Sequence, residues 1–123
     1  MIQEQYVSFE TAKLLKDKGF DEECWCYYHN SRLEHYFRKI SNRGWTTTGN
    51  VAASTQQMAM KWLREVHKIS IEITSTGYLI DNDVEWECDI KAGHRLYFKH
   101  ITNEKSFESC AEAAIKYCLE NLI

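Results

Sequence analysis

The chain has 123 residues and a mass of 14.5 kDa, which is the size of one domain. Hydrophobic residues make up 44% and charged residues 27% of it, which excludes a disordered chain, and no apolar run approaches the length of a membrane helix. The formal charge of −3 is too mild for a general nucleic-acid binder. We therefore expect one globular domain over residues 1–123 that binds neither membranes nor nucleic acid in general.

The cellular compartment is inferred from the start of the chain and from the cysteines. The first residues carry no basic group followed by an apolar run, so no signal peptide is visible. The chain has five cysteines, an odd number, which fits reduced thiols. We expect a cytoplasmic protein.

The first two elements in chain order are a helix and a hairpin. Ser8 is a good N-cap, and Gly19 can take the left-handed conformation that ends a helix. The β-prone aromatic segments 24–29 and 33–38 flank Asn30-Ser31, which favours a turn. These segments predict a hairpin.

A loop and a second helix follow. Residues 41–50 have no period and contain two glycines, which predicts a loop. Ser54 and Gln57 have the spacing of a capping box at the start of a helix. The apolar face of this helix is predicted to consist of Met58, Ala59, Trp62, Leu63 and Val66.

Alternating residues predict the next strands. Isoleucines alternate with polar residues over 69–74, which indicates a strand with one buried face. After a turn at 75–77 the chain leads back through 78–80, and segments 84–90 and 94–102 alternate in the same way.

The two later segments predict a second hairpin with a defined register. A three-residue loop with a left-handed Gly93 would place Trp86 opposite Phe98. The same register places the acidic row Glu85, Glu87 and Asp89 opposite basic residues, with Asp89 facing Arg95 and Glu85 facing Lys99. It also puts His100 on the apolar side of the hairpin.

The last helix is expected to begin near Ser106. Its apolar stripe is predicted to consist of Phe107, Ala111, Ala114, Ile115, Cys118 and Leu122. The fold class is therefore α+β, with an antiparallel sheet and three helices packed against it. The sheet is predicted to be a meander of three to four strands plus an N-terminal hairpin.

Three segments also support a resemblance. The opening YVSFETAKLLKDKGFD (6–21), the segment STQQMAMKWLREVHKISIEI (54–73) and the ending SCAEAAIKYCLENLI (109–123) resemble a family of small uncharacterised proteins found in gut Bacteroides and their phages. The similarity is weaker over 24–53 and 77–103. The resemblance implies a phage or prophage setting and a small accessory or anti-defence protein, and it supplies no catalytic residue.

The sequence contains few residues with the spacing of a metal site or a catalytic site. Cys24 and Cys26 form a CxC pair rather than the CxxC of most structural zinc sites, so buried free thiols are favoured and neither a metal nor a cofactor is expected. His29 and His35 could face each other across the first hairpin with Glu34 nearby. A small hydrolase using these groups is therefore kept as an alternative.

A basic and aromatic segment carries the leading functional hypothesis. Residues 30–53 contain four basic residues and one acidic residue, a charge of +3, and the rest of the chain therefore carries −6. Aromatic rings, guanidinium groups and a helix N-terminus suit an anionic, nucleotide-like ligand. The expected ligand-binding residues are Tyr28, Tyr36, Arg38, Lys39, Arg43, Trp45 and Thr47.

The leading hypothesis is a non-catalytic binding protein that sequesters an anionic small molecule or a host protein. A purely structural protein-interaction module is the second alternative. We also expect a homo-oligomer if a hairpin leaves an edge strand open.

Overall fold

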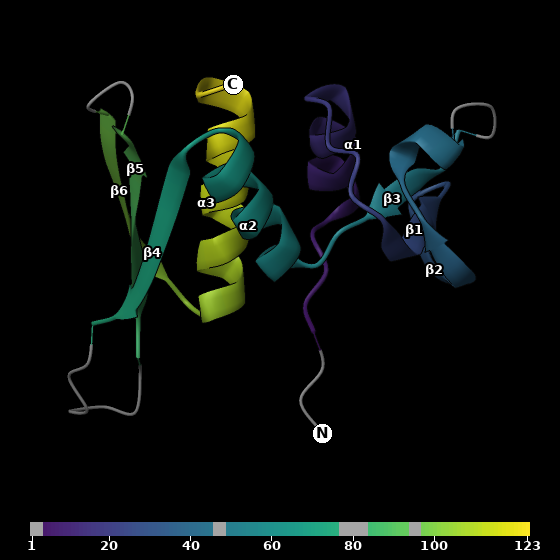
Figure 1. Ribbon diagram of the computed structural model, residues 1–123. Coiled ribbons are helices and arrows are strands. Elements are labelled where there is room, and N and C mark those ends of the chain that lie inside the picture. The colour runs from purple at the N-terminus through teal and green to yellow at the C-terminus, as the bar shows by residue number, and fades with distance from the viewer. Residues whose placement is uncertain (1–3, 46–48, 77–83, 94–96) are drawn as a thin grey trace.

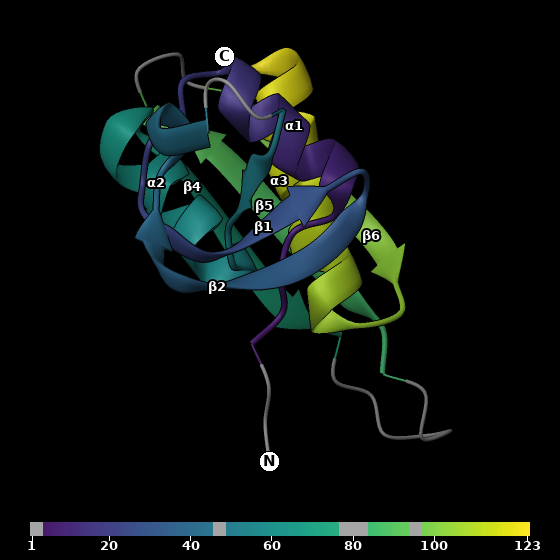
Figure 2. The ribbon, with the colours of Figure 1, turned by 90° about the vertical axis from the view of Figure 1, so that its right-hand side faces the viewer.

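The computed structural model describes residues 4–45, 49–76, 84–93 and 97–123, and its fold is of the predicted α+β class. The strands form two three-stranded antiparallel sheets, ordered β2-β1-β3 and β4-β5-β6. The three helices lie between the two sheets, as the two perpendicular views show (Figures 1 and 2). The described elements are α1 (Phe9–Asp17), β1 (Cys24–His29), β2 (Arg32–Ile40), η1 (Asn42–Trp45), β3 (Val51–Ala53), α2 (Gln56–Val66), β4 (Ile69–Ser75), β5 (Trp86–Ala92), β6 (Tyr97–Glu104) and α3 (Phe107–Asn121).

Helix α1 has the predicted ends. The Ser8 hydroxyl accepts a hydrogen bond from the Thr11 amide at 3.2 Å, which caps the first turn. Gly19 has a φ of 91°, and the Phe20 amide donates to the Leu15 carbonyl at 2.9 Å. This 6→1 bond is that of a Schellman ending, so both predicted signals are confirmed.

The first sheet contains the predicted hairpin and one strand that was not predicted. Asn30 and Ser31 both have positive φ, at 49° and 66°, as the two-residue turn between β1 and β2 requires. Residues 51–53, for which no element was predicted from the sequence, form β3 beside β1. The buried side chain of Asn42 fixes this arrangement, because it donates to the Phe20 carbonyl at 3.0 Å and accepts from the Ala52 amide at 2.8 Å.

Helix α2 begins one residue later than predicted, and its buried face is rotated. The N-cap is Thr55, whose hydroxyl accepts from the Met58 amide at 3.2 Å, so the prediction of Ser54 was wrong. Ala59, Trp62 and Leu63 are buried as expected. Met58 and Val66 were predicted to be in the core and are exposed, because Gln56 and Met60 face inward instead.

The second hairpin has a different register from the predicted one. Strand β5 continues to Ala92, which pairs with Tyr97, so the connection is longer than three residues. Trp86 consequently pairs with Glu104 rather than with Phe98. Gly93 does not have the predicted positive φ, and a Cβ there would meet no atom within 4 Å. The expected turn at 75–77 and the return segment 78–80 fall largely outside the described residues.

Helix α3 has the predicted start and the predicted stripe. The Ser106 hydroxyl accepts from the Ser109 amide at 3.0 Å, and the reciprocal bond completes a capping box. The buried residues of this helix are Cys110, Ala111, Ala114, Ile115, Cys118 and Leu119, and its C-cap residue Leu122 is buried as well. The helix contacts all three strands of the second sheet and also α1 and α2, so it forms the centre of the core.

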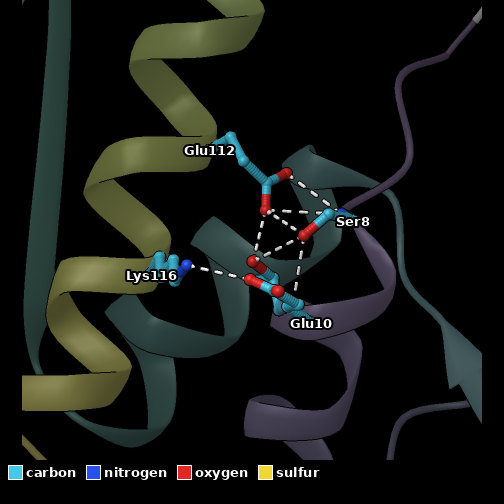
Figure 3. A network of polar contacts seen from close by, with 5 residues as sticks. Ser8, Glu10, Glu112 and Lys116 are labelled. Atoms are coloured by element: carbon cyan, nitrogen blue, oxygen red, sulfur yellow. Dashed lines mark hydrogen bonds and ion pairs between the residues drawn. The ribbon is translucent and has the colours of Figure 1, made fainter.

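A polar network joins α3 to the start of α1 (Figure 3). The Glu112 carboxylate accepts hydrogen bonds from the Ser8 amide at 3.2 Å, from the Ser8 hydroxyl at 3.1 Å and from the buried Thr11 hydroxyl. It also accepts from the Gln56 amide group at 3.4 Å, which brings in α2. One carboxylate thus ties the first turns of α1 and α2 to α3.

Candidate functional site

The first hairpin presents the exposed apolar side chains that characterise the site. Phe37 is 78% exposed and Trp25 is 46% exposed, and Leu33 is also exposed. Large apolar side chains are normally buried, so their exposure on one hairpin makes this the candidate contact surface of the molecule. We name this the hairpin surface and define it as Trp25, Leu33, His35, Phe37, Arg38 and Lys39.

Ring contacts hold the hairpin surface together. The Trp25 and His35 rings are stacked, with centroids 5.9 Å apart and planes at 13°. The Lys39 ammonium lies 5.8 Å from the centroid of the Trp25 ring, which is the ring that stacks on His35. Phe37 lies between His35 and Ile40, in the stretch of β2 where the register with β1 shifts, and its ring contacts that of Tyr36 at 4.4 Å between centroids. The Arg38 guanidinium lies 5.8 Å from the Phe37 ring.

A groove beside α2 adjoins this surface. It has a volume of about 220 Å³ and is lined by Glu22, Met58, Lys61, Trp62, Glu65 and Val66, which we name the α2 groove. Met58 also lines a neighbouring groove of about 210 Å³, together with Trp25 and Lys39. Met58 and Val66, which the sequence predicted to be buried, therefore form the apolar walls of an open groove.

Several of the predicted ligand-binding residues lie together but are enclosed. Trp45 is 8% exposed, and its ring packs against Tyr27 at 4.9 Å and Tyr36 at 5.1 Å between centroids. Tyr36 is half-buried and also contacts Phe37 at 4.4 Å. The rings of Trp45 and Tyr36 are therefore packed against other rings of the hairpin.

The remaining predicted residues point in different directions. The Tyr28 ring is buried, and its hydroxyl donates to the Val7 carbonyl at 2.6 Å. Arg43 forms an ion pair with Asp21 at 3.0 Å, and the Ser41 hydroxyl together with Arg43 lowers the pKa of that carboxyl. Arg38 and Lys39 lie on the hairpin surface as described. Thr47 lies outside the described residues.

The N-terminus of α2, expected to attract an anion, is already hydrogen-bonded. The Gln56 amide donates to the Gln5 carbonyl at 2.8 Å, and the Met58 amide donates to Thr55. These bonds occupy N–H groups that a phosphate at this helix end would need. The start of α2 thus serves to hold the N-terminal segment.

The two histidines of the hydrolase hypothesis do not face each other. His29 pairs with Arg32 in the register of the hairpin, whereas His35 pairs with Cys26. The His29 ring nitrogen lies 2.8 Å from the Asn50 amide oxygen, and the His35 ring stacks on Trp25. Each histidine contacts a different residue, so the prediction that His29 and His35 face each other was wrong.

The five cysteines are all buried thiols. Burial raises the pKa of Cys24, Cys88 and Cys118 to about 12. Such thiols stay protonated at neutral pH and are poor nucleophiles and poor metal ligands. Among the described residues, no group of three His, Cys, Asp or Glu is placed to hold a metal ion.

The outer face of the second sheet carries an acidic row that is paired differently from the prediction. His100 was expected on the apolar side and is exposed, 2.6 Å from Asp89 and 3.4 Å from Glu87. Glu85 is 3.9 Å from Lys105 rather than opposite Lys99, which faces Ile90. The expected partner Arg95 lies outside the described residues.

A measurement of the pKa of His100 would test the observed register of β5 and β6 directly. The hydrogen bond that the His100 ring donates to the Asp89 carboxylate, together with the charges of Asp89 and Glu87, raises the pKa of His100 above its ordinary value of 6.5. Protonated His100 therefore stabilises the fold at pH below the unfolded-state value, and the contribution disappears as the pH rises through the higher folded-state pKa. An NMR titration of the His100 ring should show the raised pKa, and Asp89→Asn should lower it. A titration unchanged by Asp89→Asn would contradict the register.

Sequence reasoning missed the most exposed part of the site. Trp25, Leu33 and Phe37 were assigned to β-prone segments without a prediction of which face they occupy. The available signal was the absence of clean polar alternation along 32–40, where exposed apolar and charged residues are neighbours.

Comparisons with known proteins add no identification. No protein-family model matches the chain, and no match was found among the curated proteins or the solved structures. Within the described part of the chain, none of the helices is long and apolar enough to cross a bilayer. The resemblance to the Bacteroides and phage family stays a prediction.

Proposed function

We propose that this is a non-catalytic binding protein whose hairpin surface docks onto another protein. The observation that carries the proposal is the exposure of Phe37 and Trp25 beside the cations Arg38 and Lys39. Aromatic and arginine side chains dominate the energetics of many protein interfaces. The partner would present an apolar patch with acidic residues around it. In the phage setting that the resemblance implies, this partner would be a host protein.

The enclosure of the predicted ligand-binding residues supports a protein partner over a small anion. Trp45 and Tyr28 are buried, and the Arg43 guanidinium is paired with Asp21. A ligand would have to displace the ring contacts of Trp45 before it could stack on that side chain, and it would compete with Asp21 for the exposed guanidinium of Arg43. A protein surface can instead use Phe37, Arg38 and Lys39 where they already lie.

Photo-crosslinking in the producing cells would test the proposal. A benzophenone side chain replaces Phe37 in one variant and Phe98 in the control variant. Phe98 is a suitable control because it is 59% exposed and belongs to β6. The helices separate β6 from the hairpin of β1 and β2 (Figure 1). We expect a crosslinked protein of another sequence at position 37 and none at position 98. The double change Arg38→Glu and Lys39→Glu should abolish the crosslink.

Two results would contradict the proposal. Equal crosslinking at both positions would show that the hairpin has no preference for a partner. Stabilisation of the purified protein by nucleotides in a thermal-shift assay, lost in Arg43→Ala, would favour the small-anion hypothesis instead.

A further inference from the structure

We propose that two copies of this chain associate, with Phe37 of each copy seated in the α2 groove of the other. The chain carries both halves of such a contact. Phe37 is the most exposed of the large apolar side chains in the described residues. The α2 groove has apolar walls at Met58 and Val66, both of which are exposed.

The size of the groove suits a single side chain. Pockets for drug-sized ligands occupy about 300–1,000 Å³, whereas the α2 groove has about 220 Å³. Its floor includes the buried ring of Trp62, and the flexible thioether of Met58 forms one wall. An aromatic ring in this groove would contact both of these side chains.

The charges of the two surfaces are complementary. Phe37 is followed by Arg38 and Lys39, both of which are exposed. The α2 groove is flanked by Glu22 and Glu65, with Lys61 as its one basic residue. Seating Phe37 in the groove of a second copy would therefore bring two cations towards two carboxylates. Such complementarity fixes register and partner choice.

The two surfaces adjoin, so one two-fold axis can relate them. Met58 lines both the α2 groove and the groove next to it, which Trp25 and Lys39 also line. Each copy could thus donate its hairpin and receive that of its neighbour at the same time, as an isologous contact requires. A standard interface needs about 800 Å² from each partner. That area is roughly a tenth of the 7899 Å² surface of this chain.

Self-association does not rest on the proposed function, although it uses the same hairpin surface. The second copy and the acidic partner would compete for Phe37. The two proposals can fail separately, since a monomeric protein could still crosslink to a partner, and a dimer could exist with no other partner.

Analytical ultracentrifugation of the full chain tests the contact with Phe37. The unmodified protein should sediment as a dimer at concentrations of tens of micromolar and above. Phe37→Ala should raise the dissociation constant by about tenfold or more, as loss of a central aromatic residue does at many interfaces. Phe98→Ala, the matched control, should leave it unchanged. A monomer at all concentrations, or equal effects of the two variants, would overturn the proposal.

A charge exchange tests which surfaces meet. Arg38→Glu with Lys39→Glu makes the hairpin acidic, and Glu22→Lys with Glu65→Lys makes the groove basic. Each double variant alone should be monomeric, because it brings like charges together in both contacts. An equimolar mixture should form a mixed dimer, because both of its contacts pair opposite charges. Circular dichroism checks that both variants are folded, and a mixture of folded variants that stays monomeric would overturn the pairing of hairpin with groove.

Discussion

Trp62→Ala should lower the free energy of unfolding by about 3–5 kcal/mol, the largest effect that we expect from a single substitution. The Trp62 ring is buried and meets the Phe20 ring edge-on, with centroids 5.4 Å apart. The His67 ring also contacts it, with centroids 4.6 Å apart. Alanine would leave a cavity between α2 and the segment that follows α1, where the backbone has little freedom to collapse.

Urea denaturation followed by far-ultraviolet circular dichroism measures this loss without depending on tryptophan fluorescence. Trp25→Ala provides the matched control, since Trp25 is largely outside the core. Its loss should be within about 1 kcal/mol, because surface substitutions seldom cost more. Similar losses for both variants would show that Trp62 does not contribute to the core as described.

The helices were predictable because their signals are local. A serine N-cap, a C-terminal glycine and a stripe of period 3.6 each involve residues within one or two turns of one another. Ser8 and Gly19 therefore predicted both ends of α1 correctly, and Ser106 predicted the start of α3. Helix α2 had two hydroxyl residues in succession, Ser54 and Thr55, and only the tertiary contact of the Gln56 amide with Gln5 decides between them.

The second hairpin could not be predicted because its register depends on the length of its connection. Both β5 and β6 alternate, so several registers give acceptable apolar and charged pairs. The observed register differs from the predicted one by an odd number of residues. This difference turns Phe98 to the outer face beside Lys91 and places His100 next to Asp89. The predicted register was favoured because it pairs acidic residues with basic ones. The observed register pairs opposite charges equally well.

The candidate site was only partly predictable for a related reason. The basic and aromatic segment singled out from the sequence contains most of the hairpin surface, but composition does not show which rings are covered. Trp25 and Trp45 both belong to this part of the chain, yet Trp45 packs against Tyr27 and Tyr36 while Trp25 is exposed. Strand β3 has three residues and is too short to show alternation. It was not predicted because the sequence carries no other local signal for it.

Glu112→Ala should cost about 2–3 kcal/mol of folding free energy, which is the second large effect. Alanine removes the acceptor of the Ser8 amide and hydroxyl (Figure 3). It also removes the longer of the two hydrogen bonds of the Gln56 side chain, which still donates to the Glu108 carbonyl at 2.9 Å. The buried Thr11 hydroxyl keeps one partner, the Ser8 hydroxyl at 3.1 Å, which limits the loss. The carboxylate also lies at the positive end of α1, so its charge contributes a few tenths of a kcal/mol beyond the hydrogen bonds.

A double-mutant cycle with Thr11→Val distinguishes this network from a general loss of helical charge. Valine keeps the shape of threonine but cannot donate to Glu112, so the losses of the two single variants should overlap by about 0.5–3 kcal/mol in the double variant. Glu120→Ala, which removes an exposed glutamate two turns further along α3, should cost less than about 0.5 kcal/mol. Strictly additive losses for Thr11 and Glu112 would contradict the network. Overlapping losses, together with the neutral control, would establish that one carboxylate of α3 holds the first turn of α1 in place.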